Sequence, residues 1–110
     1  MEFPSDEELL SLKALILPGS YHSVYEEGLQ HQVEPYKKFI KKIFYEHPHI
    51  KLVGICFGHQ IIAEALGGRV ARMNSSIGLY SGKETIKVEN DFFEMPCVKQ
   101  VLSEYDTSDI

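Results

Sequence analysis

Short apolar runs and one longer amphipathic repeat follow each other through the first part of the chain. Residues 12–17 (LKALIL) and 52–55 (LVGI) are brief apolar runs, which predict strands buried on both faces. Between them, from Leu29 to Glu46, apolar residues recur every three or four positions and predict an amphipathic helix. A strand, a helix and a second strand in this order predict two parallel strands joined by a crossover helix.

Two further helices are predicted, one before the first strand and one after the second. Ser5-Asp6-Glu7-Glu8 is typical of a capped helix start, and a short helix is expected to follow it. Directly after the second strand, apolar residues at 61, 62, 65 and 66 predict a helix that ends at Gly67-Gly68. This order of elements favours an α/β fold built on a parallel sheet.

The spacing of apolar residues changes after Gly67-Gly68. Short strands are predicted at 69–73, 77–80 and 85–89, separated by turn residues, and we expect them to be antiparallel. Residues 91–104 have weak helical spacing, which Pro96 disturbs.

A cysteine lies where the second strand meets the helix that follows it. Cys56 is framed by Gly54 and Gly58, two residues before and two after it. A strand, one reactive residue, a sharp turn and a helix are the parts of a nucleophile elbow, and small neighbours leave room for a substrate. The start of the helix would direct free N–H groups at the sulfur and stabilise a thiolate. The alternative is a buried cysteine that only packs, as most free cysteines do.

Two separate motifs resemble those of a known family. GICFGHQIIAEALGG, residues 54–68, resembles the nucleophile motif of class I glutamine amidotransferases, and GSYHSVY, residues 19–25, resembles a loop of their stand-alone, GMP-synthase-like branch. The resemblance implies a partial doubly wound, flavodoxin-like parallel sheet with a nucleophile elbow and a short antiparallel region after it. It also implies that residues 1–110 form a single, partial domain of this family.

The resemblance also implies roles for individual residues. Cys56 would attack the side-chain amide of glutamine, or of another γ-glutamyl compound, and ammonia would leave. The backbone N–H groups of Gly19, Ser20 and Phe57 would hold the oxyanion of the tetrahedral intermediate. Gln60 would contact the substrate. No cofactor or metal is expected, because the chain has no ligand spacing typical of a metal site.

The catalytic base of the family has no counterpart in this sequence. The family takes it from a His-x-Glu motif downstream of the cysteine, whereas no histidine follows His59 here. His22, on the loop expected to face Cys56, is the only reasonable substitute. The other histidines are His31, His47, His49 and His59.

The resemblance therefore predicts a fragment. The family's first, central strand is also missing before Met1, so we expect a protein partner or a missing chain segment to complete the domain. As an isolated chain, it is expected to be inactive. The alternatives are a non-catalytic amidotransferase-like scaffold or assembly subunit, and a different cysteine fold with a similar elbow, which Gly58-His59-Gln60 disfavours.

The net charge and the number of cysteines limit the binding partners and the cellular compartment that are expected for this chain. The 110 residues carry a net charge of −5, which argues against nucleic-acid binding. Two cysteines do not form a disulfide framework, so a reducing, cytoplasmic environment is expected, and Cys97 is interpreted as a packing residue. No apolar window is long enough to span a membrane.

Overall fold

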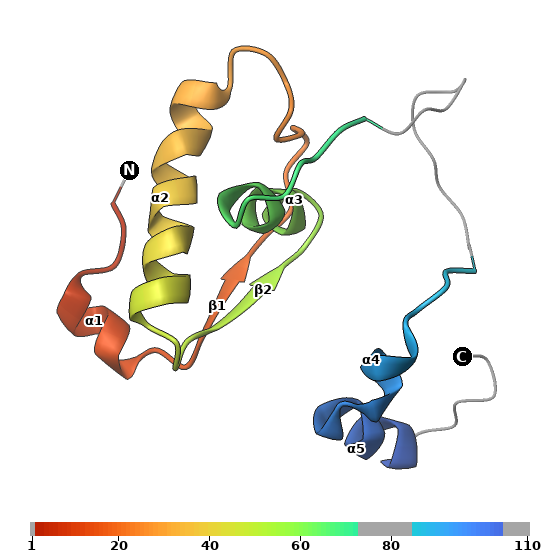
Figure 1. The fold of residues 1–110 in the computed structure, drawn as a ribbon. Helices are drawn as coiled ribbons and strands as arrows, with labels where there is room; N and C mark the ends of the chain where they lie inside the picture. The colour runs from red at the N-terminus through yellow and green to blue at the C-terminus, as the bar shows by residue number, and fades with distance from the viewer. Residues whose placement is uncertain (1, 73–84, 105–110) are drawn as a thin grey trace. The chain divides into compact units, whose positions relative to one another are not determined.

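The structure, a computed structural model, describes residues 2–72 and 85–104 (Figure 1). The chain divides into two compact units, Met1–Gly78 and Leu79–Ile110, and each is considered by itself. The predicted strand at 77–80 lies outside the described residues.

The described residues of the first unit form a small parallel sheet and three helices. Its elements are α1 (Asp6–Ser11), β1 (Ala14–Leu17), α2 (Gln30–Glu46), β2 (Lys51–Gly54) and α3 (Phe57–Ala65). β1 and β2 pair in parallel, with Ala14 opposite Lys51 and Leu17 opposite Gly54. The predicted α/β order, with α2 as the crossover between two parallel strands, is therefore confirmed.

The helix ends follow local sequence signals. At the start of α1 the Ser5 hydroxyl accepts a hydrogen bond from the Glu8 N–H, and the Glu8 carboxylate accepts one from the Ser5 N–H, which is the predicted capping box. α2 ends at the residue before His47-Pro48, as predicted. Pro35 lies in the second turn of α2 and not in its first, so the interior of this helix lacks one N–H donor.

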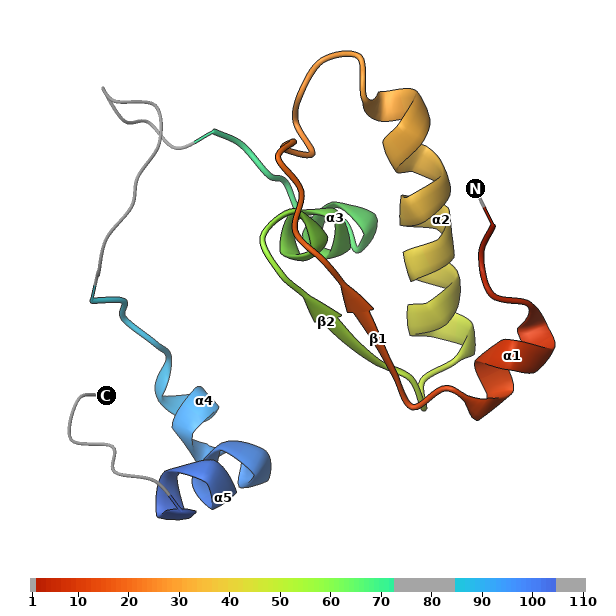
Figure 2. The same cartoon turned by 180° about the vertical axis from the view of Figure 1, so that it is seen from behind.

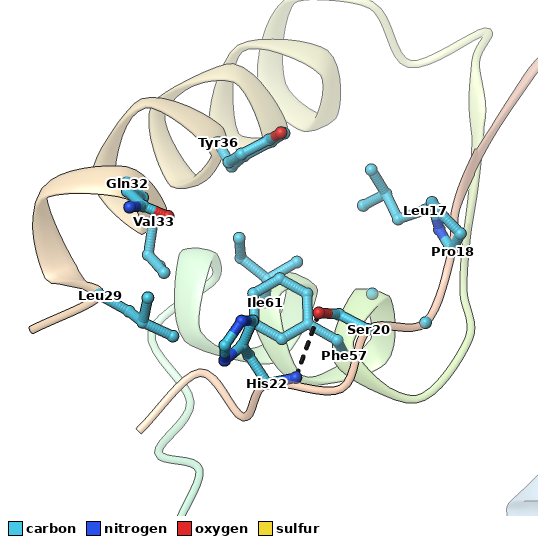
Figure 3. Close-up of a pocket in the computed structure, with 12 residues that line it drawn as sticks. Leu17, Pro18, Ser20, His22, Leu29, Gln32, Val33, Tyr36, Phe57 and Ile61 are labelled. Carbon is cyan, nitrogen blue, oxygen red and sulfur yellow. Dashed lines mark hydrogen bonds between the residues drawn. The ribbon is translucent and has the colours of Figure 1, made fainter. Parts of the chain in front are cut away.

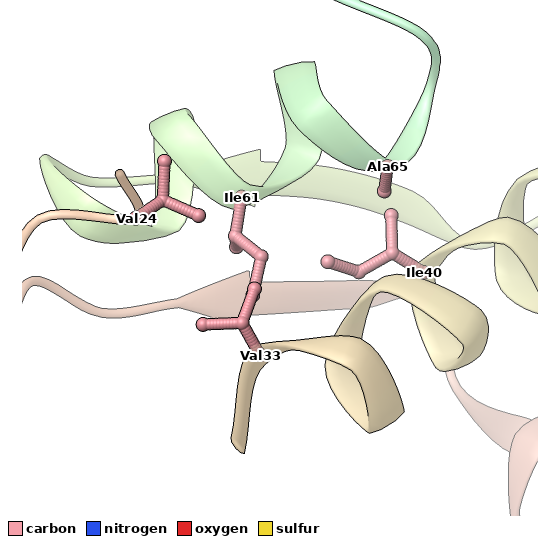
Figure 4. Packing of buried hydrophobic residues seen from close by; sticks show 5 residues of the cluster. All are labelled: Val24, Val33, Ile40, Ile61 and Ala65. Carbon is pink, nitrogen blue, oxygen red and sulfur yellow. The ribbon is translucent and has the colours of Figure 1, made fainter. Parts of the chain in front are cut away.

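Apolar side chains of α2 and α3 fill one side of the first unit. α3 lies in front of the two strands in Figure 1 and behind them in the reversed view of Figure 2. One buried cluster joins the two helices and the loop after β1, and a second joins α1 to the end of α2. The first comprises Val24, Val33, Ile40, Ile61 and Ala65 (Figure 4), and the second comprises Leu9, Ile43 and Ile50. These contacts hold the helix after Cys56 against the sheet.

The opposite face of the sheet is exposed. Ile16 and Val53 lie opposite each other in the register and are 62% and 48% exposed, and Ile55 beyond them is 56% exposed. The prediction of strands buried on both faces is thus wrong for the described chain. Within the described residues of the first unit, nothing covers this face of the two strands.

In the second unit, residues 85–104 are described and form two short helices. α4 spans Asn90–Glu94 and α5 spans Pro96–Glu104, separated by Met95, whose backbone is extended. The break has the predicted cause, because a residue before proline avoids the helical region. The strands predicted at 69–73 and 85–89 are wrong for the part that the structure describes, since 69–72 and 85–89 form no strand. An alternating pattern becomes a strand only where a neighbouring strand accepts its hydrogen bonds.

Candidate functional site

Cys56 occupies a strained backbone conformation at the junction of β2 and α3. Its φ and ψ are 52° and −108°, and among the described residues it is the only one other than glycine with a positive φ. The N–H of Gly58 donates to the carbonyl of Ile55 at 2.9 Å, which closes a four-residue turn around the cysteine. The angles are close to those of the first central position of a type II′ turn, about 60° and −120°, where glycine is usual. A residue other than glycine in this place stores backbone strain.

The two framing glycines let the turn pack directly on the strands. A Cβ atom on Gly58 would lie 2.1 Å from the carbonyl oxygen of Leu17, and one on Gly54 would lie 2.5 Å from the backbone nitrogen of His59. Both clashes are with backbone, which cannot move aside as a flexible side chain can. The glycines therefore fix the first turn of α3 against the end of β1, and the thiol of Cys56 remains exposed.

The loop after β1 lies beside the cysteine. A Cβ atom on Gly19 would lie 3.4 Å from the Cβ of Cys56, so Gly19 approaches the cysteine within van der Waals distance. In the part of the chain that the structure describes, the N–H groups of Gly19, Ser20 and Phe57 donate to no acceptor. The structure thus brings two of the residues predicted from the sequence, Gly19 and Phe57, next to Cys56, with unused donors on the backbone.

Side chains from both helices hold this loop through Val24. The N–H of Val24 donates to the amide oxygen of Gln60 at 3.0 Å, and its carbonyl accepts from the amide nitrogen of Gln30 at 3.2 Å. Val24 itself is 2% exposed and belongs to the larger buried cluster. Gln60, predicted to contact substrate, is therefore engaged through its oxygen by the loop.

A histidine and a carboxylate form a second contact within the loop. Nδ1 of His22 lies 3.1 Å from a carboxylate oxygen of Glu26, and the other carboxylate oxygen accepts from the N–H of Ser23 at 2.7 Å. The Ser23 N–H, and after it the His22 side chain, hold the pKa of Glu26 below its usual 4.5. Both side chains are open to solvent, at 61% and 41% exposed. The spacing of four residues was visible in the sequence, but the pair was not predicted.

A pocket of about 290 Å³ adjoins the loop on the side of α2 (Figure 3). Its walls are mainly apolar, and Ser20, His22 and Phe57 contribute to them. The hydroxyl of Ser20 accepts a hydrogen bond from the His22 N–H at 3.1 Å (Figure 3). Cys56 is not among the lining residues, so the pocket is a neighbour of the thiol and does not contain it.

Cys97 differs from its prediction. It is exposed, in the first turn of α5, and is not a packing residue. Both cysteines therefore lie at a helix start, so this position alone does not separate them. The distinguishing features of Cys56 are its positive φ and the approach of Gly19.

The described residues offer no place for a metal ion, since no three histidine, cysteine or acidic side chains gather among them. Within the same residues, every helix is too short or too polar to cross a membrane.

Comparison with known proteins identifies the family. A model described as glutamine amidotransferase class-I matches residues 1–104. The chain belongs to this family. γ-Glutamyl peptidase 4 of Arabidopsis thaliana is 35% identical to it over 98 residues, which cover 84% of this chain and 38% of the peptidase. The glutamine-hydrolysing GMP synthase of Staphylococcus epidermidis is 36% identical over 91 residues, which cover 81% of this chain and 15% of the synthase.

A third relative supports the same family. A glutamine amidotransferase-like protein of Schizosaccharomyces pombe is 36% identical over 66 residues, which cover 60% of this chain and 26% of that protein. The chain thus spans between 15% and 38% of the length of these three relatives. No solved structure matches it.

Proposed function

We propose that Cys56 is the nucleophile of an amidotransferase domain that hydrolyses the side-chain amide of glutamine or of another γ-glutamyl compound. The observation that carries the proposal is the strained turn, which holds an exposed thiol beside Gly19 at the start of α3. A nucleophile elbow combines the same strand, turn and helix. The two substrate classes are those in the names of the GMP synthase and peptidase relatives.

The chemistry follows from the groups around the thiol. The thiolate attacks the amide carbon, and the carbonyl oxygen becomes an oxyanion that the N–H groups of Gly19, Ser20 and Phe57 stabilise. The carbon–nitrogen bond then breaks, and the nitrogen takes a proton and leaves as ammonia or an amine. Water attacks the resulting thioester, which releases the γ-carboxylate and restores the thiol.

A general base is needed to take the proton from the thiol and then, as its conjugate acid, to donate it to the leaving nitrogen. His22 lies on the loop beside Cys56, while His49 contacts the carbonyl of Leu9 in α1. We expect the 110 residues alone to release no ammonia from glutamine, because a cysteine without a positioned imidazole turns over poorly. Measurable ammonia release that is lost when Cys56 is replaced and reduced in His22→Gln would contradict this expectation, and it would assign the base to His22.

The exposed sheet face supports the proposal that further protein completes the domain. Ile16, Val53 and Ile55 present apolar side chains on a face that parallel sheets normally bury. A protein partner or a further chain segment packed on this face would also be able to bring a catalytic base to Cys56. If the base is absent from the complete assembly as well, the second candidate function is a non-catalytic scaffold subunit that uses this same face.

Covalent labelling tests the nucleophile directly. A chloroketone analogue of glutamine should alkylate Cys56 with saturating kinetics, and free glutamine should slow the reaction. Peptide mass spectrometry would locate the adduct, and Cys97 provides an internal control, since it is also exposed and lies at a helix start. Equal labelling of the two cysteines, with no protection by glutamine, would refute the proposal.

A further inference from the structure

We infer that Gln60 is a positioning residue, which fixes the Gly19–Val24 loop against the helix that carries Cys56. The inference rests on the proposed function in one respect, since it assigns the loop a part in the reaction of Cys56. The contact itself is independent of that function, and it is the hydrogen bond from the Val24 N–H to the Gln60 amide oxygen.

Gln60 is connected to the cysteine as directly as to the loop. Its own N–H donates to the carbonyl of Cys56 at 3.1 Å, in the first turn of α3. Its side chain accepts from Val24, 36 residues earlier in the sequence, at 3.0 Å. A single residue thus joins the turn around Cys56 to the loop that carries Gly19 and Ser20. A shift of this side chain would move the predicted oxyanion donors relative to the sulfur.

The orientation of the Gln60 amide is set by its partner. A backbone N–H can only donate, so the oxygen of the amide, and not its nitrogen, must face Val24. Val24 is 2% exposed, and the Gln30 side chain satisfies its carbonyl, so water cannot readily replace either bond. The oxygen of Gln60 therefore faces the loop, and the bond to Val24 leaves the second lone pair of this oxygen and the amide NH2 group unused.

Two substitutions at this position separate loop positioning from substrate contact. Gln60→Glu keeps an oxygen acceptor for Val24 but loses the amide NH2 group. Gln60→Met keeps the length of the side chain and loses the acceptor. Gln100→Met, in α5, is the matched control for the same exchange in another helix.

Hydrogen exchange of the Val24 amide reports the contact without reference to activity. We expect exchange at Val24 to rise at least tenfold in Gln60→Met and to change less than twofold in Gln60→Glu and Gln100→Met. The amide of Ile61, in the same helix, should keep its protection and show that α3 is still folded. Unchanged protection of Val24 in Gln60→Met would overturn the inference.

Hydrogen exchange in the wild-type chain tests the inference even if a variant does not fold. Its Val24 amide should exchange at least a hundredfold more slowly than the amide of Glu27, an exposed residue three positions further along the chain. Equal exchange rates would overturn the inference.

Labelling of Cys56 connects the contact to the proposed reaction. The glutamine chloroketone should label Gln60→Met about tenfold more slowly than wild type, while iodoacetamide, which needs no oxyanion donors, should react at a rate within twofold. Gln60→Glu should recover most of the chloroketone rate. A loss in Gln60→Glu as large as in Gln60→Met would instead assign the amide NH2 to the substrate. If the chloroketone does not label the wild type at all, the proposed function fails while the exchange data still decide the role of Gln60.

Discussion

Replacing Cys56 by glycine should stabilise the chain, although the same replacement at an ordinary position destabilises a protein. The φ of 52° and ψ of −108° place a side chain in a region that costs about 1–3 kcal/mol for a residue other than glycine. Glycine in turn loses about 0.5–1 kcal/mol through the greater freedom of the unfolded chain. The thiol is exposed, so its removal sacrifices little burial. The net gain is therefore expected to lie between about 0 and 2.5 kcal/mol.

The measurement is urea unfolding of the glycine variant beside Cys56→Ala, which keeps the Cβ atom and hence the strain. A higher midpoint for glycine at an unchanged m-value would report relief of that strain. Cys97→Gly is the control, because Cys97 lies in a regular helix and the same exchange should cost up to about 1 kcal/mol there. A Cys56→Gly variant no more stable than Cys56→Ala would refute the strained turn.

Two further outcomes follow from the same geometry. Gly58→Ala should destabilise the chain by about 1–3 kcal/mol in urea unfolding, because its Cβ meets the Leu17 carbonyl oxygen at 2.1 Å, whereas Gly19→Ala, at 3.4 Å from the nearest atom, should cost much less. The Ser23 N–H lowers the pKa of Glu26, so the carboxylate stabilises the folded chain above its unfolded pKa, and this contribution is lost as the pH falls through the lower folded pKa. Wild type should therefore exceed Glu26→Gln in stability at pH 7 and match it in acid, and a constant difference across that range would contradict the contact.

The turn at Cys56 could be predicted from the sequence because its determinants are local. Gly54 and Gly58 flank the cysteine within two residues, and the change from a strand to a helical period marks the turn at Cys56. The loop at Gly19 was expected beside Cys56 because parallel strands end at the same edge of a sheet. The structure places Gly19 within van der Waals distance of Cys56, as expected.

The features that sequence reasoning missed depend on distant partners. The bond between Val24 and Gln60 joins residues 36 positions apart, and no spacing rule connects them. Whether residues 85–89 form a strand depends on a neighbour that accepts their hydrogen bonds, which an alternating pattern does not reveal. The exposure of Ile16 similarly depends on what packs against the sheet. The sequence of an apolar strand is the same whether or not that neighbour is present.

The central claim is that Cys56 attacks a γ-carbonyl while the N–H groups around it hold the developing oxyanion. The γ-aldehyde analogue of glutamine tests it most directly, because its addition to a thiol gives a thiohemiacetal with an oxygen in the oxyanion position. We expect this adduct to form at Cys56 and the largest amide proton shifts in the NMR spectrum to fall on Gly19, Ser20 and Phe57, with none in Cys56→Ser. An adduct at Cys56 that leaves these three amides unshifted, or an aldehyde that bonds to Cys97 as readily, would contradict it.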